Sequence, residues 1–475
     1  MEKEFVKEIA DINTDFSQWY TDVVKKAELA DYGPAKGTIV FRPYGYAIWE
    51  NLQHELDTRL KATGHVNAYF PMLIPMSLLT KESEHVEGFA PEVATITQVG
   101  KEVLDEPIVI RPTSETVICS MYSKWVQSYR DLPILINQWA NVVRWEKTTR
   151  PFLRTREFLW QEGHTVHATE SEALNEAIDI LKLYEKFCKE ILAIPVLTGR
   201  KTEKEKFAGA VTTFGMESMT LDGKSLQSGT THYLGQNFSH AYDIKFLDKT
   251  GKLEYAYQTS WGVSTRLLGA LIMAHGDQRG LVLPPMVAPV QVIVIPIAQH
   301  KESVTQTVEK LVALLKSKGI RAQADYSENS TGWKYNQWEM KGVSLRIEVG
   351  PRDIENGAMI LTRRDTHDKV TATLFDVKAV KKLLSTIQKD MYVKAKKFMQ
   401  AHIVKVHTME QMKEQLDKGN MVKAIWCGCQ ECELMVKERL QATIRVITNE
   451  HLKGKCIFCT QVKEDAKEVI FARAY

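Results

Sequence analysis

The sequence predicts an α+β domain with an antiparallel sheet flanked by helices, followed by an α/β domain and a small α+β C-terminal domain. Three observations predict this order. Strand-like runs and amphipathic helices are mixed irregularly up to residue 285. A strand–helix–strand rhythm follows, and five of the seven cysteines lie in the last fifty residues. We therefore expect domains at residues 1–285, 286–395 and 396–475.

The size and charge of the chain narrow the classes of protein it can belong to. It has 475 residues, of which 44% are hydrophobic and 25% are charged. That length exceeds what one hydrophobic core supports and fits two or three domains. The net charge of +3 excludes a bulk positive field, so any nucleic-acid surface must be a local patch.

The sequence predicts neither a secretory signal nor a membrane-spanning helix. The first residues carry acids throughout and lack an apolar run, unlike a secretory signal. The longest apolar stretch, residues 287–298, is interrupted by two prolines and a glutamine, whereas a membrane helix needs about 20 apolar residues. We therefore expect a cytoplasmic protein that does not bind a membrane.

In the first domain, two amphipathic helices are expected at residues 45–63 and 170–192. The apolar positions of the first helix are four residues apart: Ile48, Leu52, Leu56 and Leu60. In the second helix, apolar residues recur at three- and four-residue steps, and Ser171 is the expected cap. Strand-like runs lie at residues 67–70, 107–110, 141–145 and 157–162. Strands beside such helices predict the antiparallel sheet.

The second domain begins with a different pattern. Residues 290–297 form a continuous β-branched run of the kind found in a buried parallel strand. A helix is expected at residues 302–318, and Gly319 then precedes the start of another strand. This βαβ order predicts a separate α/β domain. A long helix at about residues 377–401 leads into the tail.

The cysteines fall into two groups. Cys119 and Cys188 lie alone in apolar, helix-like stretches and are expected to be buried reduced thiols. The crowding of the other five indicates a metal rather than disulfides in a cytosolic chain. Two close pairs of thiolates can surround one structural Zn²⁺; the alternative is a set of reduced thiols without metal. The candidates are Cys427 with Cys429 or Cys432, and Cys456 with Cys459.

A glycine-rich phosphate loop is not expected. Gly223-Lys224-Ser225 has the ending of such a loop, but Ser218 occupies the position of the required earlier glycine. No dinucleotide Gly-x-Gly-x-x-Gly pattern follows a strand. Any phosphate chemistry must therefore use cationic side chains.

Two stretches offer such cations. If residues 143–162 form two hairpin strands, alternate residues face one side. These residues are Arg144, Glu146, Phe158, Trp160 and Glu162. Charges on the covered face of a sheet would be costly in a core but fit a pocket for a charged nucleotide. In the second stretch, Arg266 starts an apolar helix among small residues, which leaves room for a phosphate beside its forked donors.

These patterns together resemble class II aminoacyl-tRNA synthetases. Arg144-x-Glu146, a loop and Arg154-x3-Phe158-x3-Glu162 resemble motif 2, and Ser264-x-Arg266 resembles motif 3. The helix at 45–63 and the strand that ends at Pro71 resemble motif 1, the dimer interface of that family. Three stretches narrow the resemblance to prolyl-tRNA synthetases of the archaeal/eukaryotic type, which some bacteria also carry: RPTSET at 111–116, FLWQEGH at 158–164 and KTEKEKFAG at 201–209.

The resemblance implies a homodimer that activates L-proline with ATP and Mg²⁺, releases pyrophosphate and transfers the prolyl group to the 3′-terminal ribose of tRNA(Pro). Arg144 and Arg266 are implied as the catalytic residues. Arg144 would hold the α-phosphate and the prolyl carboxylate, and Arg266 would reach the γ-phosphate. Glu146 would hold the adenine amino edge. Further contacts to the nucleotide are implied for Gln227, Thr230 and Ser264.

For proline, the family uses Thr113 and Glu115 as acceptors of the N–H groups. The resemblance adds the carboxylate contact of Arg144 and a wall around the ring formed by Trp160, Glu162, His164 and His232. Each residue alone has a simpler explanation. Thr113 and Glu115 would be a helix cap and a first-turn acid, Trp160 a core residue, and the histidines satisfied core or surface residues.

The second and third domains resemble the anticodon-binding and C-terminal domains of the same family. Arg346 and Arg352 are implied to donate to the anticodon guanines, and Glu339 is implied to accept from a guanine amino group; a charged strand and turn facing water is the alternative. The spacing in the family favours Cys432 over Cys429, which implies a zinc site of Cys427, Cys432, Cys456 and Cys459.

Two other functions remain open from the sequence. A sibling class II synthetase for threonine or glycine would share the motifs but lack the Thr113/Glu115 pair, and a catalytically silent paralogue would bind RNA or a partner. The presence of Arg144, Glu146 and Arg266 disfavours the silent paralogue. The stretch 163–259 is too short for an inserted editing domain, so no editing in cis is expected.

Overall fold

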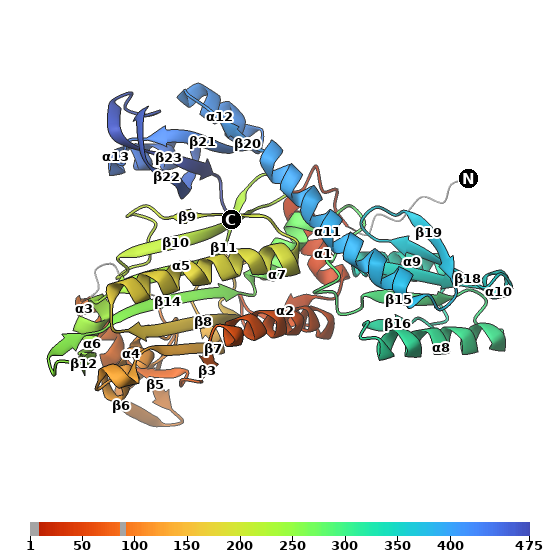
Figure 1. Cartoon of the computed structure of the whole chain (residues 1–475), viewed down its shortest axis with the longest axis horizontal. Coiled ribbons are helices and arrows are strands. Elements are labelled where there is room, and N and C mark those ends of the chain that lie inside the picture. The colour runs from red at the N-terminus through yellow and green to blue at the C-terminus, as the bar shows by residue number, and fades with distance from the viewer. Residues whose placement is uncertain (1–8, 86–91) are drawn as a thin grey trace.

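The computed structural model describes residues 9–85 and 92–475 of the chain (Figure 1). Part of the acidic start, which led us to expect no secretory signal, lies outside the described residues. The predicted fold class is confirmed. A mostly antiparallel sheet flanked by helices is followed by an α/β unit and a small α+β unit.

The first domain is built on seven strands of an eleven-stranded sheet, in the order β9-β10-β11-β14-β8-β7-β3. These strands are β3 (Val66–Asn67), β7 (Ile134–Val143), β8 (Glu157–His167), β9 (Val196–Arg200), β10 (Thr212–Met219), β11 (Ser225–Gly235) and β14 (Tyr257–Ser264). Neighbours pair antiparallel, except that β3 lies parallel to β7. Because side chains alternate along each strand, one face can pack on helices while the other carries polar groups.

The strands expected at residues 107–110 and 157–162 are confirmed. The first is the end of β6 (Glu102–Ile110) and the second is the start of β8. The strand expected at residues 141–145 is confirmed in part, because β7 ends at Val143.

The prediction of a strand at residues 67–70 is wrong after Asn67, because β3 ends at that residue. Side chains satisfy the backbone of Phe70 instead of a neighbouring strand. Gln138 Oε1 accepts a hydrogen bond from the Phe70 N–H at 2.5 Å, and Arg111 Nη1 donates to the Phe70 carbonyl at 2.8 Å. Backbone groups that already have partners have no need of a strand ladder.

Both expected helices of the first domain are present, as α2 (Pro43–Ala62) and α5 (Glu170–Phe187). The chain after α5 continues as a π-turn, η2 (Cys188–Leu192). The cap of α5 is Thr169 rather than the expected Ser171. The Thr169 hydroxyl accepts from the Glu172 N–H and the Glu172 carboxylate accepts from the Thr169 N–H, which is a capping box. The buried face of α5 packs on β10, β11 and β14 (Figure 1).

Two short helices start beside the strand face that α5 leaves free. α4 (Glu115–Trp125) begins with Glu115 and α7 (Arg266–His275) begins with Arg266. The remaining elements of the domain are α1 (Phe16–Lys26), β1 (Ala30–Tyr32), β2 (Ile39–Phe41), β4 (Leu73–Pro75), α3 (Met76–His85), β5 (Thr95–Val99), η1 (Tyr129–Asp131), α6 (Asn237–Tyr242), β12 (Lys245–Leu247) and β13 (Leu253–Tyr255).

The second domain has a five-stranded sheet in the order β16-β15-β17-β18-β19. Its elements are β15 (Val292–Pro296), α8 (Glu302–Ser317), β16 (Ala322–Ala324), α9 (Thr331–Met340), β17 (Leu345–Val349), α10 (Pro351–Glu355), β18 (Ala358–Arg363), β19 (Lys369–Thr373) and α11 (Val377–Ala401). β15 is fully buried and lies parallel to β16 and β17. The expected βαβ unit and the expected long helix are therefore confirmed.

The third domain continues the sheet of the first. α11 carries the chain from the second domain to β20 (Figure 1). The elements are β20 (Ile403–Lys405), α12 (Met409–Asp417), β21 (Met421–Trp426), α13 (Gln430–Leu440), β22 (Thr443–Lys455) and β23 (Val462–Ala472). β22 pairs with β9 at Ile447 and Arg200. At Gly199 a Cβ atom would lie 2.5 Å from the Ile447 carbonyl oxygen, so this approach requires glycine.

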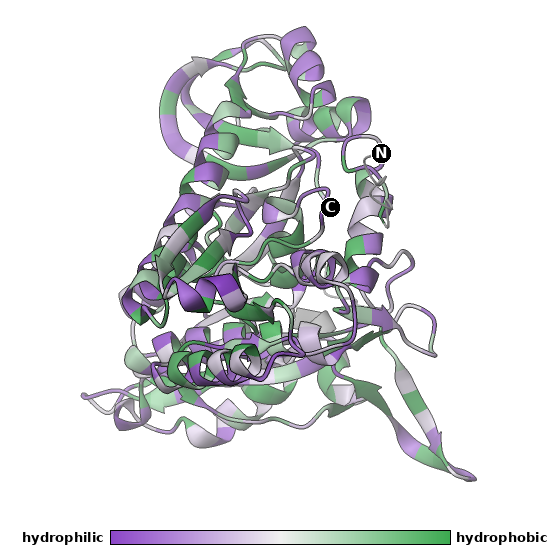
Figure 2. Cartoon of the chain, turned by 90° about the vertical axis from the view of Figure 1, so that its right-hand side faces the viewer, coloured by the Kyte–Doolittle hydropathy of each residue, from purple (hydrophilic) through white to green (hydrophobic). Residues whose placement is uncertain are grey.

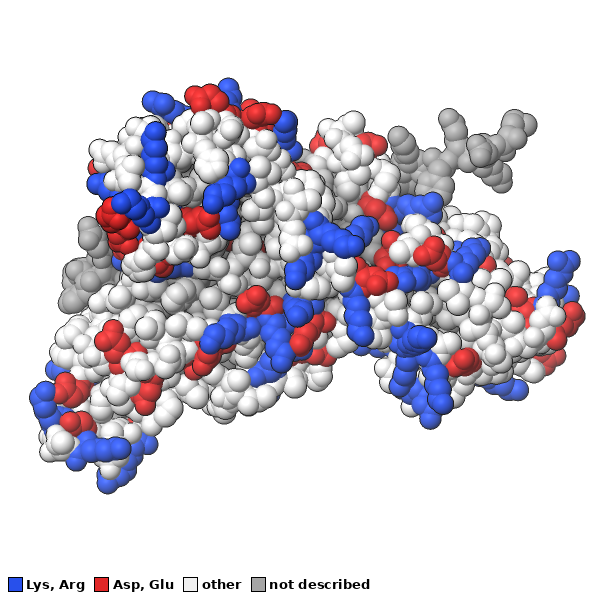
Figure 3. All heavy atoms as spheres, turned by 45° about the horizontal axis from the view of Figure 1, so that its top comes forward, with Lys and Arg blue, Asp and Glu red and all other residues white. Residues whose placement is uncertain are grey.

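The surface agrees with the composition. Figure 2 shows hydrophobic residues gathered along the strands and hydrophilic residues on the outer turns of the helices. Figure 3 shows basic and acidic side chains interspersed over one face, in keeping with the net charge of +3. Among residues 9–85 and 92–475, no helix has the length and apolar content needed to cross a bilayer.

Candidate active site

A cavity of about 270 Å³ lies on the strand face of the first domain that α5 does not cover. Strands β8, β11 and β14 form its floor, and the starts of α4 and α7 border it. Its lining includes Thr113, Glu115, Arg144, Phe158, Trp160, Glu162, His164, Glu205, Lys206, Phe207, Thr213, Gln227, Thr230, His232, Ser264 and Arg266. The cavity therefore gathers eleven of the twelve residues expected at the proline and ATP sites.

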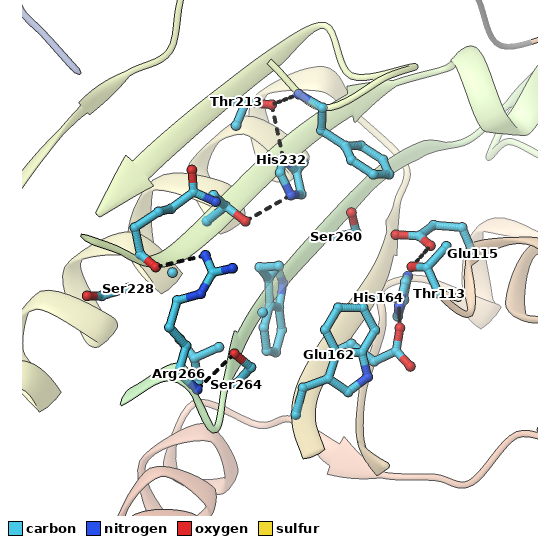
Figure 4. A pocket seen from close by; sticks show the side chains of 18 of the residues that line it. Thr113, Glu115, Glu162, His164, Thr213, Ser228, His232, Ser260, Ser264 and Arg266 are labelled. Atoms are coloured by element: carbon cyan, nitrogen blue, oxygen red, sulfur yellow. Dashed lines mark hydrogen bonds and ion pairs between the residues drawn. The ribbon is translucent and has the colours of Figure 1, made fainter. Parts of the chain in front are cut away.

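Figure 4 shows two ends of the cavity. Arg266 and Ser264 lie toward one end, whereas Glu115 and His164 lie toward the other, beside Thr113 and Glu162. His232 lies on β11 between them. A ligand that spans the cavity would meet a cation at one end and carboxylates at the other.

The carboxylate end starts at the N-terminus of α4. Thr113 and Glu115 are 6% and 5% exposed, and the Thr113 hydroxyl donates to the Glu115 carboxylate. Glu115 is the first residue of α4, so the first-turn role considered from the sequence and a place in the cavity are both present. A buried carboxylate next to a hydroxyl suits a small cationic group.

Glu162 is held by three side chains. Its Oε1 accepts from the Ser114 hydroxyl at 2.5 Å and from Gln138 Nε2 at 2.9 Å, and its Oε2 lies 2.9 Å from His164 Nε2. Burial raises the pKa of Glu162, but His164 and the two donors outweigh burial and hold it below 4.5. Burial lowers the pKa of His164, but the bond and charge of Glu162 raise it above 6.5. Each partner therefore favours the charged form of the other.

This pair makes stability depend on pH. The raised pKa of His164 gives a contribution that is complete below pH 6.5 and is lost as pH rises through the folded-state pKa. The lowered pKa of Glu162 gives a contribution that is present above pH 4.5 and is lost as pH falls through its folded-state pKa. We expect His164→Gln to cost about 3–5 kcal/mol of unfolding free energy between these values, and less at alkaline pH. Denaturant unfolding of both proteins across pH measures the difference; a constant difference would contradict the prediction.

His232 is a neutral imidazole. Burial, with a smaller effect from the charge of His164, lowers its pKa to about 3. Its two ring nitrogens lie 3.0 Å from the Thr213 hydroxyl and 3.1 Å from the Thr230 hydroxyl. The Phe207 ring lies against it, with 4.6 Å between ring centroids. His232 and Phe207 therefore present uncharged rings to the cavity, which suits an apolar ring.

Arg144 lies just beyond the end of β7. Its Nε donates to the Pro112 carbonyl at 2.9 Å, and its guanidinium lies over the rings of Phe158 and Trp160, at 5.5 and 5.3 Å from their centroids. Solvent reaches the side chain through the cavity. The surrounding protein nevertheless lowers its pKa, and nearby carboxylates, Glu115 first, partly offset that effect. An arginine stays cationic despite such a shift, and Arg144 is among the residues that line the cavity.

Arg266 is positioned by backbone carbonyls. Its Nε donates to Leu153 at 3.0 Å and its Nη1 to Gln227 at 3.3 Å, while its own N–H donates to the Ser264 hydroxyl at 3.2 Å. Burial first, then the charges of Arg154 and Arg144, lower its pKa to about 10. It is still charged at neutral pH. A cluster of three arginines of this kind favours a bound polyanion.

Glu146 is not among the residues that line the cavity. Its Oε2 lies 3.5 Å from Arg154 Nη1, and its carbonyl accepts from Arg156 Nε at 3.3 Å. Because β7 ends at Val143, the alternation that placed Glu146 beside Arg144 does not extend to it. Its contact with the adenine stays a prediction.

Several residues of the site were not predicted individually. Phe207 and Lys206 belong to the 201–209 stretch that carried the resemblance, and Thr213 supports His232. Gln138, which supports Glu162, follows Asn137 in β7, and this polar pair within a mainly apolar strand was the available signal.

The expected anticodon residues are only partly together. Arg346 Nη1 lies 2.9 Å from Glu339 Oε1, whereas Arg352 lies exposed at the start of α10. Within the described residues, the Arg352 side chain has no hydrogen bond or ion pair. The sequence did not predict that Arg279 of the first domain would lie 3.1 Å from Glu339. Arg364 adds two bonds of 2.7 Å to Asp277, so this segment is tied to the first domain.

The positions of the cysteine sulfur atoms distinguish between Cys429 and Cys432, the two candidates that the sequence spacing left open. The sulfur atoms of Cys427, Cys432, Cys456 and Cys459 all lie within 4.8 Å of one another. Four ligands around zinc with bonds of about 2.3 Å lie roughly 3.8 Å apart. The Cys427 sulfur is 3.6 Å from Cys432 and 3.8 Å from Cys459, so the set fits the ion. Cys429 lies close as well, 3.3 Å from Cys427. Cys119 and Cys188 are buried and form no disulfide, as expected.

Three family models match the chain. The tRNA synthetase class II core domain (G, H, P, S and T) matches residues 98–275, an anticodon binding domain matches residues 291–384, and the C-terminal model of prolyl-tRNA synthetase matches residues 409–475.

Curated proteins are similar over the whole length. Proline–tRNA ligase 2 of Clostridioides difficile (strain 630) is 53% identical, and proline–tRNA ligase of Alkaliphilus oremlandii (strain OhILAs) is 55% identical. Each alignment covers 100% of this chain and 99% of the relative.

Solved structures share the fold. Prolyl-tRNA synthetase of Cryptosporidium parvum complexed with halofuginone and AMPPNP has a TM-score of 0.94 and 42% identity, over 99% of each chain. The same enzyme complexed with L-proline and AMP has a TM-score of 0.91 and 40% identity, over 98% of this chain and 99% of that chain.

Proposed function

The chain belongs to the prolyl-tRNA synthetases, and we propose that its cavity on β8, β11 and β14 is where this proline–tRNA ligase activates L-proline with ATP. The observation that carries the proposal is one cavity with a guanidinium at one end and a buried Thr113–Glu115 pair at the other. Solved relatives complexed with L-proline and AMP, and with an ATP analogue, support it.

At the proline end, Glu115 and Thr113 accept the two N–H groups of the ring nitrogen. Trp160 and His232 enclose the ring, with the Glu162–His164 pair behind it. Because Glu162 already accepts from three groups, it serves to hold His164 and the wall in place rather than to bind the ammonium. The neutral His232 adds no charge that would repel the ammonium.

At the phosphate end, Arg144 binds the proline carboxylate and the α-phosphate of ATP. The carboxylate attacks this phosphate. Charge builds up there as the new bond forms, so a fixed guanidinium stabilises the transition state more than the ground state. Arg266 holds the γ-phosphate and steadies the pyrophosphate as it leaves, with Gln227, Thr230 and Ser264 as further polar contacts and Glu146 at the adenine. Mg²⁺ bound with ATP would offset part of the negative charge of the phosphates.

Transfer to tRNA(Pro) involves the other domains. We propose that the chain has domains at residues 1–285, 286–395 and 396–475. One hydrophobic core around β15, β17 and α11 and a separate one around β21 and β23 support this division. Glu339, Arg346 and Arg352 are proposed to read the anticodon guanines. A homodimer is proposed through the motif 1 stretch, where Val66 and Tyr69 are 60% and 71% exposed.

Residues 163–259 form α5, η2, β9 to β11, α6 and the β12–β13 hairpin, all of which join the first domain. We therefore propose that mischarged alanyl-tRNA is not hydrolysed in cis. The enzyme acts in the cytoplasm under this proposal.

The deciding experiment is ATP–pyrophosphate exchange with proline, threonine or glycine as the amino acid. Exchange that depends on proline alone is expected. Exchange with threonine or glycine would indicate a sibling synthetase, and no exchange with any of them would indicate a silent paralogue.

Zinc is proposed as a structural ion of the third domain. We expect about one zinc per purified chain, bound by four thiolates. Cys432→Ser should lose most of this zinc and lower the melting temperature. Cys429→Ser is the matched control, because Cys429 lies outside the four-sulfur set, and it should keep both. Elemental analysis and thermal unfolding measure the two; loss of zinc from Cys429→Ser alone would reverse the assignment.

A further inference from the structure

The segment 201–211, called here the pocket loop, connects β9 to β10 and borders the proline end of the cavity. Glu205, Lys206 and Phe207 line the cavity, and Phe207 packs on His232. The start of the loop is buried, with Lys201 and Thr202 each 2% exposed. The position of the loop therefore depends on what holds its first two residues.

Thr202 is held from the third domain. Its hydroxyl donates to Glu433 Oε1 of α13 at 2.6 Å, and Glu433 is only 5% exposed. The Thr202 carbonyl in turn accepts from the N–H groups of Glu205 at 3.1 Å and Lys206 at 2.9 Å. The turn that presents Lys206 and Phe207 to the cavity is thus built on Thr202.

Glu433 is a buried carboxylate whose side-chain partner is a hydroxyl rather than a cation. Within the described residues, the Glu433 carboxylate forms one side-chain hydrogen bond, which comes from Thr202. No cation of the described part of the chain lies within ion-pair distance of this carboxylate. A buried carboxylate without a counter-ion is costly. Because the contact between Glu433 and Thr202 is present at a domain junction despite this cost, we infer that its geometry is important.

Lys201 is bound by Glu217 of β10, a carboxylate that the third domain also binds. Lys201 Nζ lies 2.6 Å from Glu217 Oε1, and Arg445 of β22 lies 3.1 Å from the same carboxylate. The three side chains are 1%, 0% and 8% exposed. Ser225 completes the set by donating to Glu217 at 2.6 Å. The third domain therefore meets the start of the pocket loop directly at Thr202 and through Glu217 at Lys201.

We propose that Glu433, assisted by Arg445, is a positioning residue for proline binding, which acts through Thr202 on the pocket loop. The inference rests on the proposed function, because it assigns the cavity end at Phe207 and His232 to proline. It predicts a larger effect on the proline KM than on the ATP KM, because Phe207 of the loop packs on His232 of the proposed proline wall.

The test removes the bond without changing the size of the side chain. In ATP–pyrophosphate exchange, Thr202→Val should raise the proline KM roughly 3- to 10-fold, the size of one hydrogen bond. The ATP KM and kcat should stay within about twofold. Thr202→Ser keeps the donor and should restore the proline KM. Glu433→Ala should raise the proline KM, whereas Glu433→Gln keeps an acceptor and should have a smaller effect.

Glu450→Gln is the matched control. Glu450 joins the same two domains through Arg200 of β9, at 2.7 and 2.9 Å; Arg200 also lies 3.5 Å from Glu203 of the pocket loop, but Glu450 has no hydrogen bond to Thr202. Its proline KM should not change. An equal rise in Glu450→Gln would assign the effect to general loosening of the junction and overturn the proposal.

The outcomes separate the inference from the function on which it rests. If the unaltered protein shows no exchange with proline, the proposed function fails. If it shows exchange but Thr202→Val and Glu433→Ala keep the normal proline KM, or lose kcat alone, this inference fails. If Thr202→Val does not fold, the comparison of Glu433→Ala with Glu433→Gln gives the same decision.

Discussion

Arg144→Ala should lower the kcat of proline-dependent ATP–pyrophosphate exchange by about 10²–10³-fold, the usual effect of removing one preorganised donor from a developing charge. The side chain is fixed by the Pro112 carbonyl and by the rings of Phe158 and Trp160. Its fork is therefore aimed before substrate binds. Steady-state kinetics with proline and ATP varied separately measures the effect.

Arg144→Lys is the control for charge. It keeps the cation but loses the two-pronged donor, so an intermediate loss is expected. Thermal unfolding should show both variants folded, because Arg144 is exposed to the cavity rather than part of the core. Activity of Arg144→Ala within tenfold of normal would contradict the proposed role.

Glu115→Gln should raise the proline KM roughly 10- to 150-fold, the range expected when a hydrogen bond to a charged group is lost. The substitution keeps the shape of the side chain but removes the charge that faces the ammonium of proline. The KM for ATP should change little, since Arg144 and Arg266 are unaltered. Exchange kinetics across proline concentrations measures the effect.

Glu157→Gln is the matched control for that substitution. Glu157 lies at the start of β8 and bonds to Asn141 at 2.8 Å, outside the residues that line the cavity. Its proline KM should remain within about twofold. If both variants shift the KM equally, Glu115 has no special part in proline binding.

The sequence predicted the elements whose pattern is local and long. Residues 377–401 carry an apolar stripe over seven turns, and α11 has those bounds. Trp160, Glu162 and His164 alternate along β8, so a period of two was enough to place them on one face. The resemblance then supplied Thr113 and His232, which come from distant parts of the chain.

What the sequence could not supply depends on contacts between distant segments. Thr169 caps α5 in place of the predicted Ser171. Only Thr169 is followed three residues later by a glutamate, Glu172, which completes the capping box. The predicted strand does not reach Phe70, because side chains of Gln138 and Arg111 bond to the backbone groups of that residue. Neither the pairing of Glu339 with Arg279 nor that of Thr202 with Glu433 has a periodic signal, since each joins two domains.

The pairing of β22 with β9 has a consequence for solubility. Without the third domain, β9 would be the outermost strand on that side of the sheet, and its N–H and C=O groups would be open to another molecule. Such exposed strand edges are templates for self-association. A chain shortened before β22 would therefore be prone to aggregate even if its catalytic groups were intact, because the C-terminal residues also shield the margin of the sheet.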